Sequence, residues 1–360
     1  MSRWAKTRRV FFVEEPVIEK GANVIRTSKR ENGVCVVTPH LSSEENKNAV
    51  QEKLLSEFIK RQKIQSYLSW YLSPMFLPYT SHLTPEFIVY DCMDELSGFA
   101  GAPEGLLENK CQLFTMSDLV FTGGLTLYEA KAKLHPNIHA FPSSIDFHHF
   151  SKARQLLLDP LDQREIPSPR VGYYGVIDER MDQDLVDAVA EQRPNWHWIF
   201  VGPVLKIDPE KLPRRPNIHY LGKKDYQSLP SYLSGWDVAV LPFARNDATR
   251  YISPTKTPEY LAAGKPVVST SIRDVVRPYG ERGLVHIADN PQEFVNGIQK
   301  SLSLGPDWLS KVDGYLWNLS WDQTWSRMNR LVAETWQDVS VTEQPSTQNY
   351  VLRRESNAHV

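Results

Sequence analysis

The sequence predicts an α/β protein with two domains, each built on a parallel β-sheet. At 360 residues, the chain is long enough for two domains of ordinary size with separate cores. In its second half, short apolar runs alternate with segments whose apolar residues recur at helical spacing. Several of the predicted strands are followed by a glycine or proline, among them Gly175, Gly202 and Pro242. Because the carboxyl ends of parallel strands form the ligand-binding edge of such a sheet, we expect these turns to converge on one site.

The first half contains similar elements in a less regular order. The predicted strands are 9–13, 33–37, 87–90, 118–121 and 137–141, with a helix at 106–116 and another after Gly123-Gly124. The strand at 87–90 runs into an acidic turn that holds Asp91, Asp94 and Glu95. We therefore expect three carboxylates at the carboxyl edge of the first sheet.

The second half alternates regularly. The predicted strands are 170–174, 197–201, 217–221, 237–241, 266–270 and 284–287, and the predicted helices are 182–192, 226–234, 257–263 and 291–302. An amphipathic helix at 321–339 follows, and its apolar face is expected to pack back on the first domain. We expect domains at 1–150 and 170–320, a proline-bearing linker at 151–169 and a disordered polar tail at 340–360.

The segment 253–270 is the most informative part of the chain. It reads as a loop, a helix with Thr257 as N-cap and Pro258 at its first position, a glycine turn and a buried strand. A helix N-terminus binds phosphate, and Lys256 adds a positive charge there. Glu259 could accept hydrogen bonds from the vicinal hydroxyls of a sugar. A phosphate beside a diol is typical of a nucleotide or nucleotide sugar; the alternative is an ordinary βα unit with charged surface residues.

Composition excludes several other classes. With a net charge of −2, the protein as a whole has no positive electrostatic field that would attract nucleic acid. The three cysteines match no metal or redox spacing and are expected to be reduced, as in a cytoplasmic protein. No signal peptide is recognised, and no apolar run reaches the ~18 residues of a membrane span. A dinucleotide-binding dehydrogenase is disfavoured because no Gly-x-Gly-x-x-Gly follows a strand.

The chain resembles glycosyltransferases of the GT-B fold, most closely the retaining bacterial family 4, or group 1, of polysaccharide and teichuronic-acid type. The likeness rests on three segments: Phe141-Pro-Ser-Ser-Ile-Asp146, Gly172-Tyr-Tyr-Gly175 with Asp178-Glu-Arg180, and 256–269. It implies two Rossmann-like domains facing a cleft, the first on the acceptor side and the second binding a nucleotide sugar. It also implies a metal-independent hexosyltransferase that needs no cofactor, because the nucleotide sugar is a substrate.

The resemblance also implies roles for individual residues. The donor-binding residues would be Gly175, Arg180, Lys206, Lys256, Thr257 and Glu259. One of Asp91, Asp94 and Glu95 would orient the acceptor hydroxyl, the alternative being that Asp91 or Asp94 caps a helix. The sequence departs from the family at Tyr251, where many relatives carry a first glutamate, so Lys256 is expected to meet the diphosphate directly.

The expected acceptor is a polysaccharide, a lipid-linked sugar or a cell-envelope precursor. The expected location is the cytoplasm, either free or in peripheral contact with the inner face of the membrane. Two other functions share the fold: a nucleotide-sugar 2-epimerase and a non-catalytic donor-binding subunit. The first residues, Ser2-Arg-Trp-Ala-Lys, resemble the end of the helix that follows the family's first strand. We therefore expect the first domain to lack its first βα unit, with a gap or exposed edge near 10–13 and 87–90 and an upstream extension of about 15–30 residues that restores it.

Overall fold

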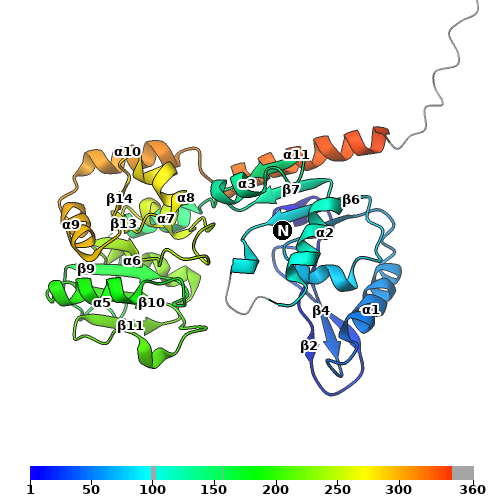
Figure 1. Cartoon of the computed structure of the whole chain (residues 1–360), viewed down its shortest axis with the longest axis horizontal. Coiled ribbons are helices and arrows are strands. Elements are labelled where there is room, and N and C mark those ends of the chain that lie inside the picture. Colours follow the sequence, from blue (N-terminus) through cyan, green and yellow to red (C-terminus); the bar gives the residue numbers. More distant parts are fainter. Residues whose placement is uncertain (99–102, 156, 343–360) are drawn as a thin grey trace, which may run out of the picture.

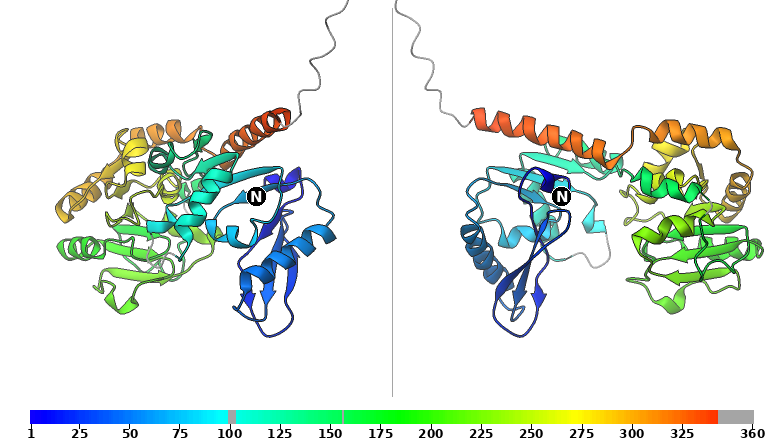
Figure 2. Two further views of the ribbon diagram at one scale, coloured as in Figure 1. Left: turned by 45° about the vertical axis from the view of Figure 1, so that its right-hand side comes forward. Right: turned by 180° about the vertical axis from the view of Figure 1, so that it is seen from behind.

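The structure is a computed structural model that describes residues 1–98, 103–155 and 157–342. Within these residues the chain forms two α/β units side by side (Figure 1). A long helix, α11 (Trp321–Thr342), leaves the second unit and runs along the first. Seen from behind, it crosses the first unit above the sheet (Figure 2).

The second unit is built on a parallel sheet with the strand order β11-β10-β9-β12-β13-β14. Its strands are β9 (Arg170–Tyr174), β10 (His197–Val201), β11 (Ile218–Gly222), β12 (Val238–Leu241), β13 (Val267–Ser269) and β14 (Val285–Ile287). Every residue of β12 and β13 is buried, as expected for strands covered on both faces. The chain runs outward from β9 to β11 and then returns to β12, so the order reverses between β9 and β12. Ligands bind in the crevice at such a reversal.

The helices of this unit begin where the sequence offers good capping groups. The Asp182 side chain accepts a hydrogen bond from the Leu185 N–H, and Asn290 does the same for Glu293. The helices are α5 (Gln183–Gln192), α6 (Leu229–Ser234), α7 (Lys256–Ala262), α8 (Arg273–Val275), α9 (Pro291–Ser301) and α10 (Pro306–Leu316). They cover the sheet on both faces (Figure 1).

The first unit has two separate sheets. One is parallel, with the order β5-β6-β7-β8, and consists of β5 (Leu68–Tyr71), β6 (Phe87–Cys92), β7 (Leu119–Thr122) and β8 (Ile138–Ala140). In the other, β4 (Cys35–Leu41) pairs in parallel with β1 (Phe11–Val13) and β2 (Val17–Ile18), and antiparallel with β3 (Val24–Lys29). The associated helices are α1 (Lys47–Arg61), α2 (Leu106–Met116) and α3 (Leu125–Lys131), and α4 (Phe147–Ser151) lies where the chain enters the second unit.

Helix α11 belongs to the core of the first unit. The ring centroids of Trp325 and Trp4 lie 5.8 Å apart, and Trp336 stacks on Phe87 at 5.7 Å. Val332, between them on the helix, is buried in the same cluster. The apolar stripe that the sequence shows at 321–339 therefore lies against the first unit.

The two units meet at the start of α3. The carboxylate of Asp274, from α8, accepts hydrogen bonds from the backbone N–H groups of Leu125 (2.9 Å) and Thr126 (3.0 Å). Beside it, Glu129 forms ion pairs with Arg273 (2.9 Å) and Arg277 (2.5 Å). A residue of the second unit thus supplies the N-terminal cap of a helix in the first.

Two expectations about the first unit differ from the structure. β6 is paired on both sides, by β5 and β7, so the expected gap beside 87–90 is wrong. The strand that fills this place, β5, was not recognised in the sequence, nor were the helices α1 and α10. Helix α11 continues to Thr342, and the rest of the predicted tail, 343–360, lies outside the described residues.

None of the helices that the structure describes is both long and apolar enough to cross a membrane.

Candidate active site

The candidate site lies at the reversal of strand order in the second sheet. Gly175 follows β9, and the segment 243–255 follows β12 and leads into α7. The Ala244 N–H donates to the Arg180 carbonyl at 2.8 Å, which holds the two loops together. The residues predicted separately after β9 and at the mouth of α7 therefore gather in one place.

Gly175 is required by the close approach of Lys256. Its φ is +135°, and a Cβ at this position would lie 2.2 Å from Lys256 Cε and 2.8 Å from Nζ. Its backbone also packs against Gly202, where an added Cβ would lie 1.8 Å from the Gly175 carbonyl oxygen. Any larger residue at either glycine would push the lysine or the turn out of place.

Lys256 is the first residue of α7, and its ammonium group is largely withdrawn from water. Burial lowers its pKa, while the charge of Glu259 acts in the opposite direction. The ammonium lies 5.7 Å from the Tyr173 ring centroid. Across the described part of the chain, no carboxylate lies within the 4.0 Å of a salt bridge to this group. The site therefore holds a buried cation that is not neutralised by direct contact.

Glu259 lies one turn further along α7 and is held by Tyr174. The Tyr174 hydroxyl donates to Glu259 Oε2, and the Tyr174 N–H donates to the Tyr260 hydroxyl at 2.9 Å. Burial raises the pKa of Glu259 to about 7, with Tyr174 and Lys256 opposing the rise. Glu259 is thus oriented at the mouth of the crevice by a tyrosine that sequence reasoning missed, although Tyr174 directly precedes the glycine turn.

Arg180 is fixed by a buried carboxylate. Its Nε lies 2.9 Å from Asp178 Oδ1 and its Nη2 lies 2.6 Å from Oδ2, a two-point contact. Asp178 is 5% exposed and also accepts from the Arg180 N–H. The charge of Arg180 is one of the influences that lower the pKa of Lys256, so the two cations act on the same region.

One of the predicted donor-binding residues, Thr257, does not have the capping role that was expected of it. α7 begins at Lys256, one residue before Thr257, and the Thr257 hydroxyl is buried without a hydrogen-bond partner among the described residues. Thr257 is therefore not the N-cap. Lys206 is exposed on the loop after β10, with a left-handed φ of 61°.

The three predicted catalytic carboxylates have three different environments. Asp91 lies within β6 and accepts a hydrogen bond from Trp70 Nε1 at 3.2 Å; burial raises its pKa to about 6. Glu95 forms ion pairs with Lys110 (2.6 Å) and Lys131. Burial would raise the pKa of Glu95, but hydrogen bonds from these groups and Ser97 outweigh it and hold the value at about 2.

Asp94 is the carboxylate of this turn whose pKa is influenced by a residue of the second unit. Burial raises its pKa, and the charge of Arg180, from the second unit, opposes the rise. The groups that contact Asp91 and Glu95 belong to the first unit, and the catalytic role of each of the three carboxylates stays a prediction.

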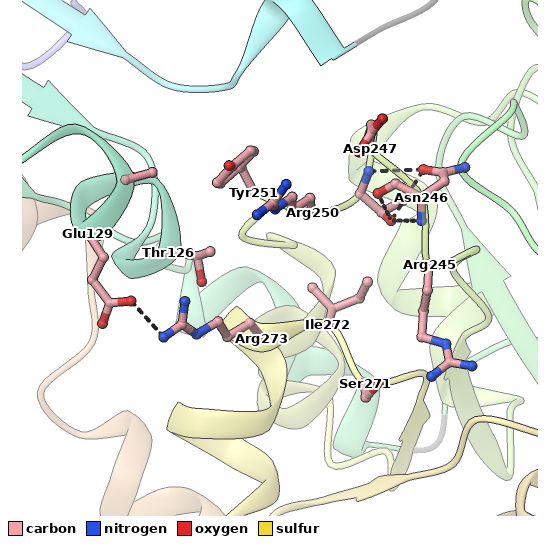
Figure 3. Close-up of a pocket in the computed structure, with 12 residues that line it drawn as sticks. Thr126, Glu129, Arg245, Asn246, Asp247, Arg250, Tyr251, Ser271, Ile272 and Arg273 are labelled. Atoms are coloured by element: carbon pink, nitrogen blue, oxygen red, sulfur yellow. Dashed lines mark hydrogen bonds and ion pairs between the residues drawn. The ribbon is translucent and has the colours of Figure 1, made fainter.

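A cleft of about 740 Å³ lies between the units, bounded by α3, the loop after β12 and the start of α8, and the predicted site residues are not among the described residues that line it. Figure 3 shows Arg250 and Tyr251 in the middle of its lining, between the Glu129–Arg273 ion pair and Asn246. The Arg250 guanidinium lies 5.3 Å from the Tyr251 ring centroid. Tyr251, which stands where many relatives of the resembled family carry a glutamate, therefore lines an open cleft between the units.

The described residues contain no group of three or more His, Cys, Asp or Glu side chains placed to hold a metal ion.

Comparison with known proteins extends this description. Residues 168–303 match the model of the family "Glycosyl transferases group 1". The chain is 24% identical over 289 residues to a protein of Bacillus subtilis (strain 168) named as a teichuronic acid biosynthesis glycosyltransferase, TuaH. That match covers 74% of this chain and 67% of the relative.

Solved structures share the fold over nearly the whole chain. Sucrose-phosphate synthase from Thermosynechococcus elongatus aligns with a TM-score of 0.69 and 12% identity, covering 94% of this chain and 91% of that one. Anabaena HepE, solved in complex with UDP and glucose, aligns with a TM-score of 0.61 and 14% identity, covering 88% of each chain. These likenesses confirm the predicted fold class of two Rossmann-like units in the GT-B arrangement.

Proposed function

Because the chain is a glycosyltransferase of the GT-B fold with a group 1 domain at 168–303, we propose that it transfers a sugar from a nucleoside-diphosphate sugar to a hydroxyl group of a glycan. The observation that carries this proposal is the placement of Lys256 and Glu259 at the Gly175 turn, where the strand order reverses. HepE, with the same fold, was solved with UDP and glucose, which supports a nucleotide sugar as donor.

The cations would stabilise the leaving group. During transfer, the bond from the anomeric carbon to the diphosphate oxygen breaks as the acceptor oxygen bonds to that carbon, and the nucleoside diphosphate departs with the electron pair. Negative charge therefore grows on the diphosphate. Lys256, which no carboxylate contacts among the described residues, and Arg180, fixed by Asp178, are preorganised to meet this charge.

Glu259 would bind the ribose. Oε2 is occupied by the Tyr174 hydroxyl, which fixes the carboxyl group, and the charged form of Glu259 accepts hydrogen bonds from vicinal hydroxyls. Because burial raises its pKa to about 7, Glu259 binds a diol best above that pH.

On the acceptor side, Asp94 would orient the incoming hydroxyl. It is the carboxylate of the acidic turn that interacts with Arg180 across the two units. Asp91 and Glu95 support the turn from within, through Trp70 and through Lys110.

The acceptor is a cell-envelope glycan or its lipid-linked precursor, and the enzyme meets it at the inner face of the membrane. The similarity to TuaH, named for teichuronic acid biosynthesis, supports this class. A cytoplasmic location agrees with a nucleotide-sugar donor.

The test begins with a panel of nucleotide sugars and thermal denaturation of the 360-residue protein. A donor that binds raises the Tm, and its affinity is then measured by calorimetry. Glu259→Gln should weaken binding about 10- to 150-fold, the equivalent of ~1.5–3 kcal/mol for a hydrogen bond to a charged group. Glu281→Gln, at an exposed position of the same unit, is the matched control and should bind like the parent.

The proposal is rejected if no nucleotide sugar shifts the Tm, or if E259Q binds the donor as tightly as E281Q. Incubation of donor without acceptor separates the other functions of this fold: conversion of the donor to its 2-epimer indicates an epimerase. Binding without transfer to any glycan acceptor indicates a donor-binding subunit.

A further inference from the structure

The cleft between the units is lined by more positive than negative side chains. Arg245, Arg250 and Arg273 line it, against the carboxylates of Glu129 and Asp247 (Figure 3). Its volume of about 740 Å³ lies within the ~300–1,000 Å³ of ordinary ligand sites. Positive charge gathered in a concave surface raises the local concentration of anions.

The carboxylates nearest two of these arginines are already engaged. Glu129 forms ion pairs with both Arg273 (2.9 Å) and Arg277 (2.5 Å), so one negative charge is shared between two positive ones. Arg245 lies 3.2 Å from Asp289, which balances it. The group around Glu129 therefore keeps a positive charge in excess at one wall of the cleft.

Arg250, in the middle of the lining, has its hydrogen-bonding groups free for a ligand. Among the described residues, no carboxylate lies within the 4.0 Å of a salt bridge to its guanidinium, and no hydrogen-bond acceptor contacts its N–H groups. The guanidinium lies 5.3 Å from the ring centroid of Tyr251, a contact with the charge that uses none of the N–H donors in a hydrogen bond.

The neighbours of Arg250 on both sides are anchored. The Thr249 side chain is buried; its hydroxyl donates to the Ala244 carbonyl (2.5 Å) and accepts from the Asn246 N–H (3.1 Å). Tyr251 packs against an apolar cluster of the first unit. Because the backbone is fixed on both sides, ordering Arg250 on a ligand costs less conformational entropy than ordering a side chain on a free loop.

We propose that this cleft binds the acceptor glycan and that Arg250 recognises an anionic group on it, a carboxylate or a phosphate. Both groups accept two parallel N–H bonds from a guanidinium. The assignment to the acceptor rests on the proposed transferase function, in which Lys256 and Arg180 meet the diphosphate of the donor. The loop that carries Arg250 leads directly into α7, which begins at Lys256, so one continuous segment would contact both substrates.

The test measures the binding of small probes to the 360-residue protein by calorimetry, with no donor present. A disaccharide that ends in glucuronate is compared with the same disaccharide ending in glucose, and glucose 1-phosphate is compared with glucose. At least one anionic probe should bind about 10-fold more tightly than its neutral counterpart, which two hydrogen bonds of ordinary net strength supply. Preference for glucuronate assigns the anion to an acidic sugar, and preference for the phosphate assigns it to a phosphorylated precursor.

Arg250→Gln should reduce the preference for the anionic probe to less than twofold. Arg282→Gln is the matched control and should keep the preference. Arg282 is also exposed and lies 5.5 Å from the ring centroid of Tyr315, but it is not among the described residues that line the cleft. Salt should weaken the preference of the parent protein, because exposed charges are screened.

The inference is overturned if anionic and neutral probes bind equally, if none of the probes binds, or if R250Q keeps the preference that R282Q shows. The donor panel described above is a separate measurement, in which R250Q should give the same Tm shift as the parent. A protein that binds a nucleotide sugar but does not distinguish the probes contradicts this inference alone. A protein that prefers the anionic probes through Arg250 but binds no nucleotide sugar contradicts the transferase function, and with it the assignment of the anion to an acceptor.

Discussion

Replacement of Lys256 by methionine should have opposite effects on stability and on donor binding. Methionine keeps the length and apolar stem of the side chain but removes the ammonium group, which is buried and has no carboxylate in salt-bridge contact among the described residues. A charge buried in this way destabilises the free protein, because its hydration is lost without a compensating ion pair. The same charge is available to a diphosphate.

The expected magnitudes follow from this environment. Removal of a destabilising group at a functional site typically raises stability by about 0.5–2 kcal/mol. At roughly 2–4 °C per kcal/mol for a domain of this size, the Tm should rise by about 1–8 °C. Loss of a charged hydrogen bond to the diphosphate should cost ~1.5–3 kcal/mol, or about 10- to 150-fold in donor affinity.

The pH dependence of this effect has a definite sign. The folded-state pKa of Lys256 is lowered, so the unfolded chain binds more protons between the folded and unfolded values. The destabilisation by Lys256 is therefore complete below the folded pKa and is relieved as the pH rises toward 10.5. The stability advantage of K256M should be largest near neutral pH and should shrink in alkaline buffer.

Lys265 provides the matched control. It is also largely buried with a lowered pKa, but its Nζ donates to the Ser234 carbonyl at 3.1 Å, away from the crevice. Lys265→Met should therefore lower the Tm and leave donor affinity unchanged. The two proteins are compared by thermal denaturation and by donor calorimetry. The reasoning is refuted if K256M lowers the Tm as K265M does, or if its donor affinity stays within twofold of the parent.

Three further predictions concern the carboxylates. Glu259 has a folded pKa of about 7, so the protein should bind donor more tightly at pH 8 than at pH 6, as calorimetry at both pH values measures. Its contribution to the free energy of unfolding should fall as the pH rises from about 4.5 through 7, because the folded state keeps the proton of Glu259 to a higher pH than the unfolded chain does. Urea denaturation at both pH values measures this second effect. Asp274→Ala leaves the first turn of α3 without its cap and should cost about 1–3 kcal/mol in urea denaturation. Asp94→Asn should lower kcat about 10²- to 10⁴-fold with normal stability, whereas Glu95→Gln should mainly destabilise, by ~3 kcal/mol, since Lys110 then loses a buried partner.

Each of these predictions has a result that would contradict it. Glu259→Gln should remove the pH dependence of donor affinity and of stability between pH 6 and 8. If either pH dependence persists in this variant, it belongs to another titratable group. An Asp274→Asn protein as unstable as the alanine variant would indicate that its charge, rather than its hydrogen bonds, holds the units together. If Glu95→Gln lost activity at full stability, the assignment of Glu95 to support of the turn would be wrong.

Much of the second unit could be predicted because its local signals agree with each other. The apolar runs at 170–174, 197–201 and 237–241 are buried strands, and the turn at Gly175 adopts a backbone angle that favours glycine. Lys256 and Glu259 were singled out because a lysine and a glutamate stand at a helix mouth that can bind phosphate, and their binding roles stay predictions. The start of α7 was misjudged by two residues because Thr257, a residue type that favours capping, is buried here instead.

The first unit was harder to predict because its decisive interactions join residues far apart in sequence. β5 contains Ser69 and Trp70, which do not form an apolar run, and its strand character comes from pairing with β6. Similarly, the sequence shows three equivalent carboxylates after β6. Only the folded chain distinguishes them, through Trp70 for Asp91, two lysines for Glu95 and Arg180 for Asp94.

The chain crosses between the two units twice, and this determines what happens to the protein when a protease cuts one of the crossings. The chain first crosses near α4 and returns at Trp321, whose N–H donates to the Ile145 carbonyl at 3.4 Å. The outward passage also includes Leu158, which is 94% exposed and accessible to a protease. A nick there would leave α11 on the later fragment but seated in the core of the earlier one. The two fragments would therefore copurify as a non-covalent complex, and denaturation would be needed to reveal that the backbone had been cut.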